Sequence, residues 1–166
     1  MSGNGKLSLT IPVSKLQGNR TITKDVIISN TQRWQQNHWR AISSAYLNSP
    51  YFEFYRDEFE TFYKENFGNL LQFNNQLMNC VCKIIDIRKE FVFTTSYNHS
   101  PDKVLDLRSV ISPKKEMKRE YFPEYIQVFS TKLGFIPNLS IIDMLFNLGP
   151  ETLDYLKSIK LEINEN

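Results

Sequence analysis

The stretch that decides the fold reads Trp34-Gln-Gln-Asn-His-Trp-Arg-Ala-Ile-Ser-Ser-Ala-Tyr46. Its apolar residues Trp39, Ile42 and Tyr46 recur at the spacing that places side chains on one face of an α-helix. The pattern predicts a helix over about residues 31–47. Asn48-Ser49-Pro50 ends this helix and begins another, because proline suits the first position of a helix and not its interior.

Helical spacing continues beyond Pro50. In the second predicted helix, which Gly68 closes, one face carries the aromatic residues Phe52, Tyr55, Phe59, Phe62 and Tyr63. A third helix is predicted over about Leu70–Ile87, where apolar residues recur at heptad-like intervals. Near the C-terminus, Ser140 and Asp143 have the S-x-x-D spacing of a capping box, which predicts a short helix that ends at Gly149.

Strand patterns are short and lie outside this helical middle. Leu7–Val13 alternates apolar and polar residues, Val26–Ser29 is a brief apolar run, and Phe91–Thr95 is rich in β-formers. With 166 residues the chain has the length of one domain. We therefore predict a helix-rich α+β fold over residues 1–166, a single domain with a small mixed β-sheet.

The composition excludes several classes of protein. The formal net charge is only +2, and the basic cluster Lys114–Arg119 is interrupted by Glu116, so no nucleic-acid partner is predicted. No apolar run approaches the ~18 residues of a membrane span, and no signal peptide is recognisable, so we expect a cytoplasmic chain without membrane insertion. Cys80 and Cys82 are two residues apart in a predicted helix and do not face each other, so neither a disulfide nor a shared metal is expected.

Strong catalytic motifs are absent. The sequence contains no Gly-rich nucleotide loop, no H-E-x-x-H, no G-x-S-x-G and no CxxC pair, which weighs against nucleotide hydrolysis, zinc chemistry and ordinary serine hydrolysis. No metal site is predicted, and no cofactor can be assigned. Function therefore depends on polar residues within the aromatic-rich segments.

His38 is the candidate catalytic residue. Histidine is the side chain best suited to general-base work near neutral pH, and Arg40 beside it could bind an anion. In a regular helix Trp34 and His38 share a face, while Arg40 points elsewhere. The alternative is a packing histidine that bonds to the backbone, with Trp39 as core.

The long polar segment 96–123 supplies three further candidates. In an extended backbone Asp106 and Arg108 lie on the same side, where they could orient a ligand or form a structural ion pair. Lys114 follows a rigid Ser-Pro turn and could meet a phosphate, or it could be a solvated lysine. Both alternatives stay open for each residue.

The C-terminal segment supplies a ligand-like surface. Tyr125, Gln127 and Phe129 alternate, so in a strand they share a face that suits a sugar or nucleoside as well as it suits an ordinary sheet. Asn138 precedes a predicted helix N-terminus, whose free N–H groups favour anions. Asn138 is therefore the candidate for ligand binding, while Ser140 and Asp143 are interpreted as helix caps.

At these residues the chain resembles the WbqC-like proteins of bacteria, over about residues 4–157. The resemblance rests on four ordered blocks: Trp34–Tyr46, Ser49-Pro-Tyr-Phe-Glu-Phe-Tyr55, Leu105-Asp-Leu-Arg-Ser-Val-Ile-Ser-Pro-Lys114, and Tyr125-Ile-Gln-Val-Phe129 with Gly134-Phe-Ile-Pro-Asn-Leu-Ser-Ile-Ile-Asp-Met-Leu-Phe-Asn-Leu-Gly-Pro150. The resemblance implies a role in making or modifying O-antigen and related surface polysaccharides. Members usually begin some tens of residues earlier, with a first strand that this sequence lacks.

Three functional hypotheses follow from these residues and the resemblance. The first is a transferase that moves an acyl or aminoacyl group to a nucleotide-linked amino sugar, with His38 as base. In it Arg40, Arg108 and Lys114 hold phosphate or carboxylate, and Tyr125, Gln127 and Asn138 contact the sugar. The second is a non-catalytic scaffold of the polysaccharide assembly machinery, and the third is an inactive fragment. A homo-oligomer is compatible with each.

Overall fold

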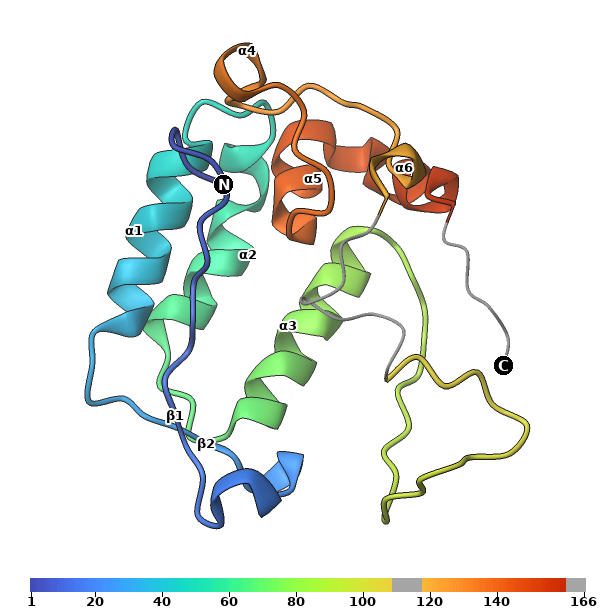
Figure 1. Cartoon of the computed structure of the whole chain (residues 1–166). Coiled ribbons are helices and arrows are strands. Elements are labelled where there is room, and N and C mark those ends of the chain that lie inside the picture. The colour runs from blue at the N-terminus through green and yellow to red at the C-terminus, as the bar shows by residue number, and fades with distance from the viewer. Residues whose placement is uncertain (109–117, 161–166) are drawn as a thin grey trace.

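The computed structural model describes residues 1–108 and 118–160, and the helices dominate it (Figure 1). The α-helices are α1 (Trp34–Tyr46), α2 (Phe52–Lys64), α3 (Leu70–Ile84), α4 (Ser130–Leu133), α5 (Ile141–Leu148) and α6 (Thr152–Ser158). Short 3-10 helices are η1 (Gly18–Arg20), η2 (Thr23–Asp25), η3 (Arg119–Tyr121) and η4 (Gly149–Glu151). The predicted helical middle is confirmed, with ends within a few residues of those expected.

The core forms where α5 packs against α1 and α2. Leu145 and Phe146 of α5 are fully buried at its centre. The Phe146 ring lies 5.2 Å from the rings of Tyr46 and Phe52 and 5.6 Å from that of Phe59, in tilted or edge-to-face geometry. Such pairs add to the free energy of burying apolar area. The predicted aromatic stripes of α1 and α2 therefore meet on α5, about a hundred residues later in the chain.

The sheet of the described residues consists of two short strands. β1 (Val13–Ser14) pairs with β2 (Ile27–Ile28) in antiparallel register, with Val13 opposite Ile28. The predicted class, a helix-rich α+β domain with a small sheet, is confirmed, although the sheet is antiparallel and not mixed. Most of the predicted strand Leu7–Val13 runs as an extended segment without ladder pairing, in front of α1 and α2 in Figure 1.

The predicted strand Phe91–Thr95 is wrong. These residues are exposed and lie in a segment without helix or strand after α3. Their composition favours extended backbone, but a strand also needs a partner whose N–H and C=O groups complete the ladder. No such ladder includes residues 91–95.

The turn between α5 and α6 requires its glycine. Gly149 has φ +56°, and a Cβ at this position would meet the Tyr51 ring at 2.5 Å. The Tyr51 backbone N–H donates to the carbonyl of Phe146 (3.0 Å), which ties the backbone that carries this ring to α5. Only glycine combines the left-handed backbone with this close approach.

Among the described helices, none is both long enough and apolar enough to cross a membrane.

Candidate functional site

A cavity of about 450 Å³ lies between α1, α3, the extended N-terminal segment and the loop before α5. Its volume falls within the ~300–1,000 Å³ of typical small-molecule sites. Aromatic and aliphatic side chains form most of the wall. The polar members of the wall are Lys6, Ser8, His38, Tyr46, Tyr63, Asn74, Asn138 and Ser140. The cavity thus brings together two of the predicted site residues, His38 and Asn138.

His38 lies in the cavity wall, packed against two aromatic rings that also contact each other. Its imidazole is 5.2 Å from the Trp34 ring, in the edge geometry that the i, i+4 spacing on α1 allows, and 6.4 Å from the Tyr63 ring. Burial lowers the pKa of His38 from its usual value, and a hydrogen bond with the backbone of Thr10 opposes this shift. His38 therefore packs against aromatic side chains and also lines the cavity, so both interpretations of the sequence apply to it. Its lowered pKa keeps the imidazole neutral near pH 7.

Asn138 lines the cavity from the loop before α5, far from His38 in the sequence. Its backbone has φ +53°, a left-handed conformation that asparagine tolerates better than most residues. The predicted capping box that follows is wrong, because Ser140, the N-cap of α5, makes no side-chain cap bond. Ser140 lines the cavity instead.

Asp143 is not a helix cap but the centre of a buried hydrogen-bond network. Its carboxylate is fully buried and accepts at Oδ1 from the Tyr46 hydroxyl, at 2.7 Å. At Oδ2 it accepts from the Tyr125 hydroxyl at 2.6 Å and from Gln127 Nε2 at 3.0 Å. Burial and the neighbouring Asp143 charge raise the pKa of both Tyr46 and Tyr125, so both phenols stay protonated as donors.

Gln127 connects this network to the loop that carries Asn138. Its Nε2 donates to the carbonyl of Ile136 and its Oε1 accepts from the N–H of Ile136, both at 2.9 Å. Its side chain is 2% exposed, whereas the neighbouring Ile126 is 84% exposed. The alternation predicted for Tyr125 and Gln127 is therefore present, but both point at Asp143 and neither lines the cavity.

A sequence signal for Asp143 does exist. It is the one charged residue within the apolar run Ile141-Ile-Asp-Met-Leu-Phe-Asn-Leu148, on a helix that reaches the core. A carboxylate in such a position must find hydrogen-bond donors when the helix is buried. Its partners come from residues far away in the sequence, so the sequence indicates a partnered carboxylate without naming the partners.

The candidate anion-binding residues lie outside the cavity. Arg40 is exposed on α1, and Arg108 does not line the cavity wall. Lys114 lies outside the described residues. Ligand binding by these three residues stays a prediction.

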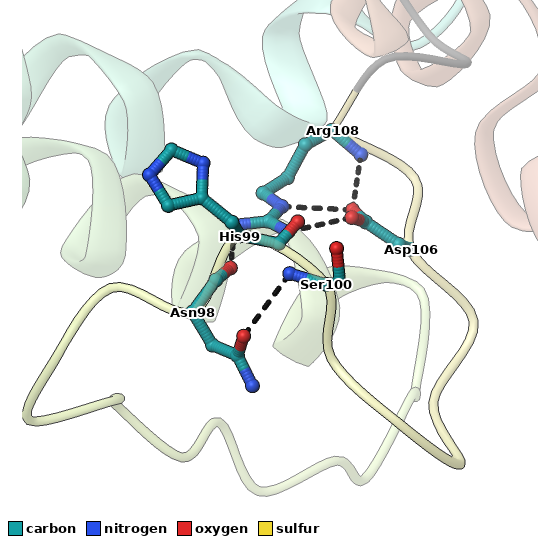
Figure 2. A network of polar contacts seen from close by, with 5 residues as sticks. All are labelled: Asn98, His99, Ser100, Asp106 and Arg108. Carbon is teal, nitrogen blue, oxygen red and sulfur yellow. Dashed lines mark hydrogen bonds and ion pairs between the residues drawn. The ribbon is translucent and has the colours of Figure 1, made fainter.

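Arg108 is held within its own loop, as Figure 2 shows. Its Nε and Nη2 donate to the two carboxylate oxygens of Asp106, at 2.8 and 2.6 Å, and its Nη1 donates to the carbonyl of Asn98 at 2.8 Å. The guanidinium also lies 4.9 Å from the centre of the Tyr97 ring. These bonds to Arg108 lower the pKa of Asp106 to about 2. The pair therefore acts as a structural clamp for residues 97–108.

A second hollow, of about 640 Å³, lies between α2, α3 and η4 and is mainly apolar. The scaffold hypothesis predicts that Tyr55 and Phe59 are partly exposed in one contiguous patch. Tyr55 is half-buried and lines this hollow, in agreement with that prediction. Phe59 is instead 2% exposed in the core, and Phe54, one of the residues that line this hollow, is 73% exposed.

Among the described residues, no group of three or more His, Cys, Asp or Glu side chains is placed to hold a metal ion.

Fold and site together define a class of protein: a small helix-rich α+β domain with an aromatic and amide-lined cavity and a buried carboxylate behind its wall. The chain belongs to the WbqC-like protein family, whose model matches residues 1–119 and 115–155.

A relative comes from Mycobacterium tuberculosis (strain ATCC 25618 / H37Rv). The chain is 25% identical to its uncharacterized protein Rv1507c over 177 residues, covering 90% of this chain and 75% of that protein. No solved structure was found to match the chain.

Proposed function

We propose that this protein takes part in the biosynthesis or modification of bacterial surface polysaccharide and binds a sugar, or a nucleotide-linked amino sugar, in the His38 cavity. The observation that carries the proposal is a neutral, buried imidazole in the wall of a small-molecule cavity, packed against the rings of Trp34 and Tyr63. Membership of the WbqC-like family agrees with a polysaccharide-related role.

The wall of the cavity suits a carbohydrate. The apolar faces of sugar rings pack against aromatic side chains, and their hydroxyls need donors and acceptors that are arranged around them. Asn74, Asn138 and Ser140 provide amide and hydroxyl groups on two different sides of the cavity. Amide side chains can donate and accept at once, as sugar hydroxyls require.

The reaction we propose is transfer of an acyl or aminoacyl group. The acceptor hydroxyl or amine loses a proton to the imidazole of His38 while its oxygen or nitrogen forms the new bond to the acyl carbon. The bond between that carbon and the donor breaks, and the leaving group takes the proton from His38. A neutral imidazole with a lowered pKa is the form that can accept the first proton.

The remaining residues have supporting roles in this proposal. Asn138 contacts the sugar directly, while Tyr125 and Gln127 support the cavity from behind through Asp143 and Ile136. Arg40, Arg108 and Lys114 would contact nucleotide phosphates that extend beyond the cavity, with Asp106 orienting Arg108.

The test combines binding and turnover. UDP-glucosamine is titrated calorimetrically against the full chain, and acyl transfer from acetyl-coenzyme A is followed by release of the free thiol. His38→Ala should lower turnover by ~100-fold or more with little change in binding. Activity of the unchanged protein should fall as the pH drops through the lowered pKa of His38, because the protonated imidazole cannot accept a proton.

Two variants sharpen the test. Asn138→Gly keeps the left-handed backbone and removes the amide, so it should weaken binding without unfolding the chain. Arg88→Ala, on the surface away from the cavity, serves as the neutral control. Full turnover by His38→Ala would refute the catalytic role. Binding without turnover for any acyl donor would favour the scaffold hypothesis, for which the exposed Phe54 beside the apolar hollow is the supporting observation.

A further inference from the structure

The mainly apolar hollow between α2, α3 and η4 is separate from the His38 cavity. No described residue lines both of them. The hollow lies where α2 and α3, which run in roughly opposite directions in Figure 1, pack against each other. The proposed function therefore does not account for this part of the surface.

Aromatic side chains form most of one wall of the hollow. The Tyr51 ring lies 6.0 Å from that of Phe54 and 6.5 Å from that of Tyr55. Phe54 is largely exposed and Tyr55 is half-buried. Ile84 of α3 and Pro150 of η4 extend the apolar surface to the other side. Exposed aromatic side chains gathered in one hollow are typical of a surface that contacts another protein.

Two unpaired charges of opposite sign flank this apolar surface. Glu58 of α2 and Lys83 of α3 both line the hollow, and neither forms an ion pair with another described residue. Burial raises the pKa of the Cys80 thiol, the charge of Glu58 raises it further, and the charge of Lys83 lowers it. Both charged groups therefore lie close to this thiol, on different helices, and each is available to an opposite charge from outside the chain.

The two helices also differ in their overall charge. α2 contains four acidic and two basic side chains, whereas Lys83 is the one charged side chain of α3. The face therefore has a negative half and a positive half. It would repel a copy of itself that placed α2 on α2, and it would attract a copy that placed α2 on α3.

We propose that two copies of the chain associate through this hollow, about a two-fold axis that passes between α2 and α3. This rotation places α2 of each copy on α3 of the other, and both copies use the same surface. Each Glu58 then approaches the partner's Lys83, and the exposed Phe54 side chains are buried between the copies. The inference goes beyond the proposed function and does not depend on it, because the His38 cavity shares no residue with the hollow.

The size of the face predicts a weak dimer. Helices of 13 and 15 residues are each about 20 Å long. Two such helices offer at most the ~800 Å² per partner of a standard interface. We therefore expect a dissociation constant on the order of 10 µM, with monomer dominant at ~1 µM and dimer at ~100 µM.

Sedimentation velocity of the full chain over this range of concentrations measures the association. Glu58→Lys and Lys83→Glu each place two pairs of like charges across the axis. Each variant should raise the dissociation constant by ~10-fold or more. An equal mixture of the two variants should associate again, because every pair across the mixed dimer joins opposite charges. Binding of a different partner to the hollow would not produce this recovery.

Phe54→Asp and Val92→Asp form a matched pair of variants. Both place a carboxylate at an exposed apolar position, but only Phe54 lines the hollow. Phe54→Asp should be monomeric at ~100 µM, while Val92→Asp should associate like the unchanged chain. Thermal unfolding of each variant checks that the change affects association and not folding.

Three results would overturn the inference. A monomer at the highest of these concentrations would mean that a different partner covers the hollow. Association that persists in both charge variants, or a mixture of them that stays monomeric, would mean that the copies do not meet with Glu58 against Lys83. The sugar-transfer proposal succeeds or fails on its own binding and turnover measurements, which use the His38 cavity.

Discussion

Two of the carboxylates that accept hydrogen bonds in this protein lie in contrasting places, Asp143 in the core and Asp106 on a surface loop. Asp143 is fully buried and accepts from side chains 97, 18 and 16 residues away. Asp106 lies on the loop and pairs with Arg108, two residues away. The loop pair joins two opposite charges, whereas the side-chain donors to the core carboxylate are two phenols and one amide, all neutral. The comparison teaches that a charged partner two residues away forms a local clamp, whereas the neutral partners of Asp143 join segments that are far apart in the chain.

The largest expected effect separates the two carboxylates by stability. Asp143→Ala leaves two phenols without their acceptor in the core, removes one acceptor of Gln127 Nε2 and opens a cavity. We expect the free energy of unfolding in urea to fall by about 3 kcal/mol or more.

Asp106→Ala is the matched change on the loop. Solvent surrounds that pair and replaces its bonds, so the unfolding midpoint should stay within experimental error of the unchanged protein. Equal losses from the two alanine variants would break the comparison, because the surface clamp would then matter as much as the core network.

A second change tests the core beside the network without removing any polar group. Gly149→Ala places a methyl group against the Tyr51 ring, at a backbone conformation that alanine disfavours. We expect a loss of about 1–3 kcal/mol, measured by thermal unfolding.

Gly68→Ala is its control. No heavy atom lies within 4 Å of the Cβ that would be added there, and its backbone is not left-handed. A Gly149→Ala protein as stable as the Gly68→Ala protein would show that the α5–α6 turn can move aside, and that the core around Asp143 is less rigid than its contacts indicate.

The smallest effect concerns the loop alone and is a titration. The pKa of Asp106 is about 2 in the folded protein because Arg108 holds its ionised form, whereas an unfolded chain has about 3.9. The clamp therefore contributes above pH ~4 and is lost as the pH falls through about 2. Arg108→Ala should return the midpoint to near 3.9 when the side-chain carbon is followed by NMR. An unchanged midpoint would mean that other groups lower the pKa of Asp106.

Local patterns predict much of this molecule. The helical middle, the shared face of Trp34 and His38, and the contact between Asp106 and Arg108 depend on residues a few positions apart. The positions of such neighbours follow from the geometry of one helix or one extended segment.

The features that could not be predicted depend on residues far apart in the chain. Phe91–Thr95 has strand composition but no ladder partner, and Asp143 has capping spacing but bonds to Tyr46 across 97 residues. Composition and spacing describe what a residue can do, while the folded chain decides which partner it meets. The fold likewise brings His38 and Asn138 into one cavity, whereas the sequence predicts each of them only as a separate candidate.

The side chain of Gln127 bonds to the peptide group of Ile136 in both directions, as a residue of a neighbouring strand would. In a ladder, many residues share the task of holding two segments together, and the loss of one bond is absorbed by the others. Here both hydrogen bonds come from a single amide, which also donates to Asp143. A change at this one position therefore affects the loop before α5 and the buried carboxylate together.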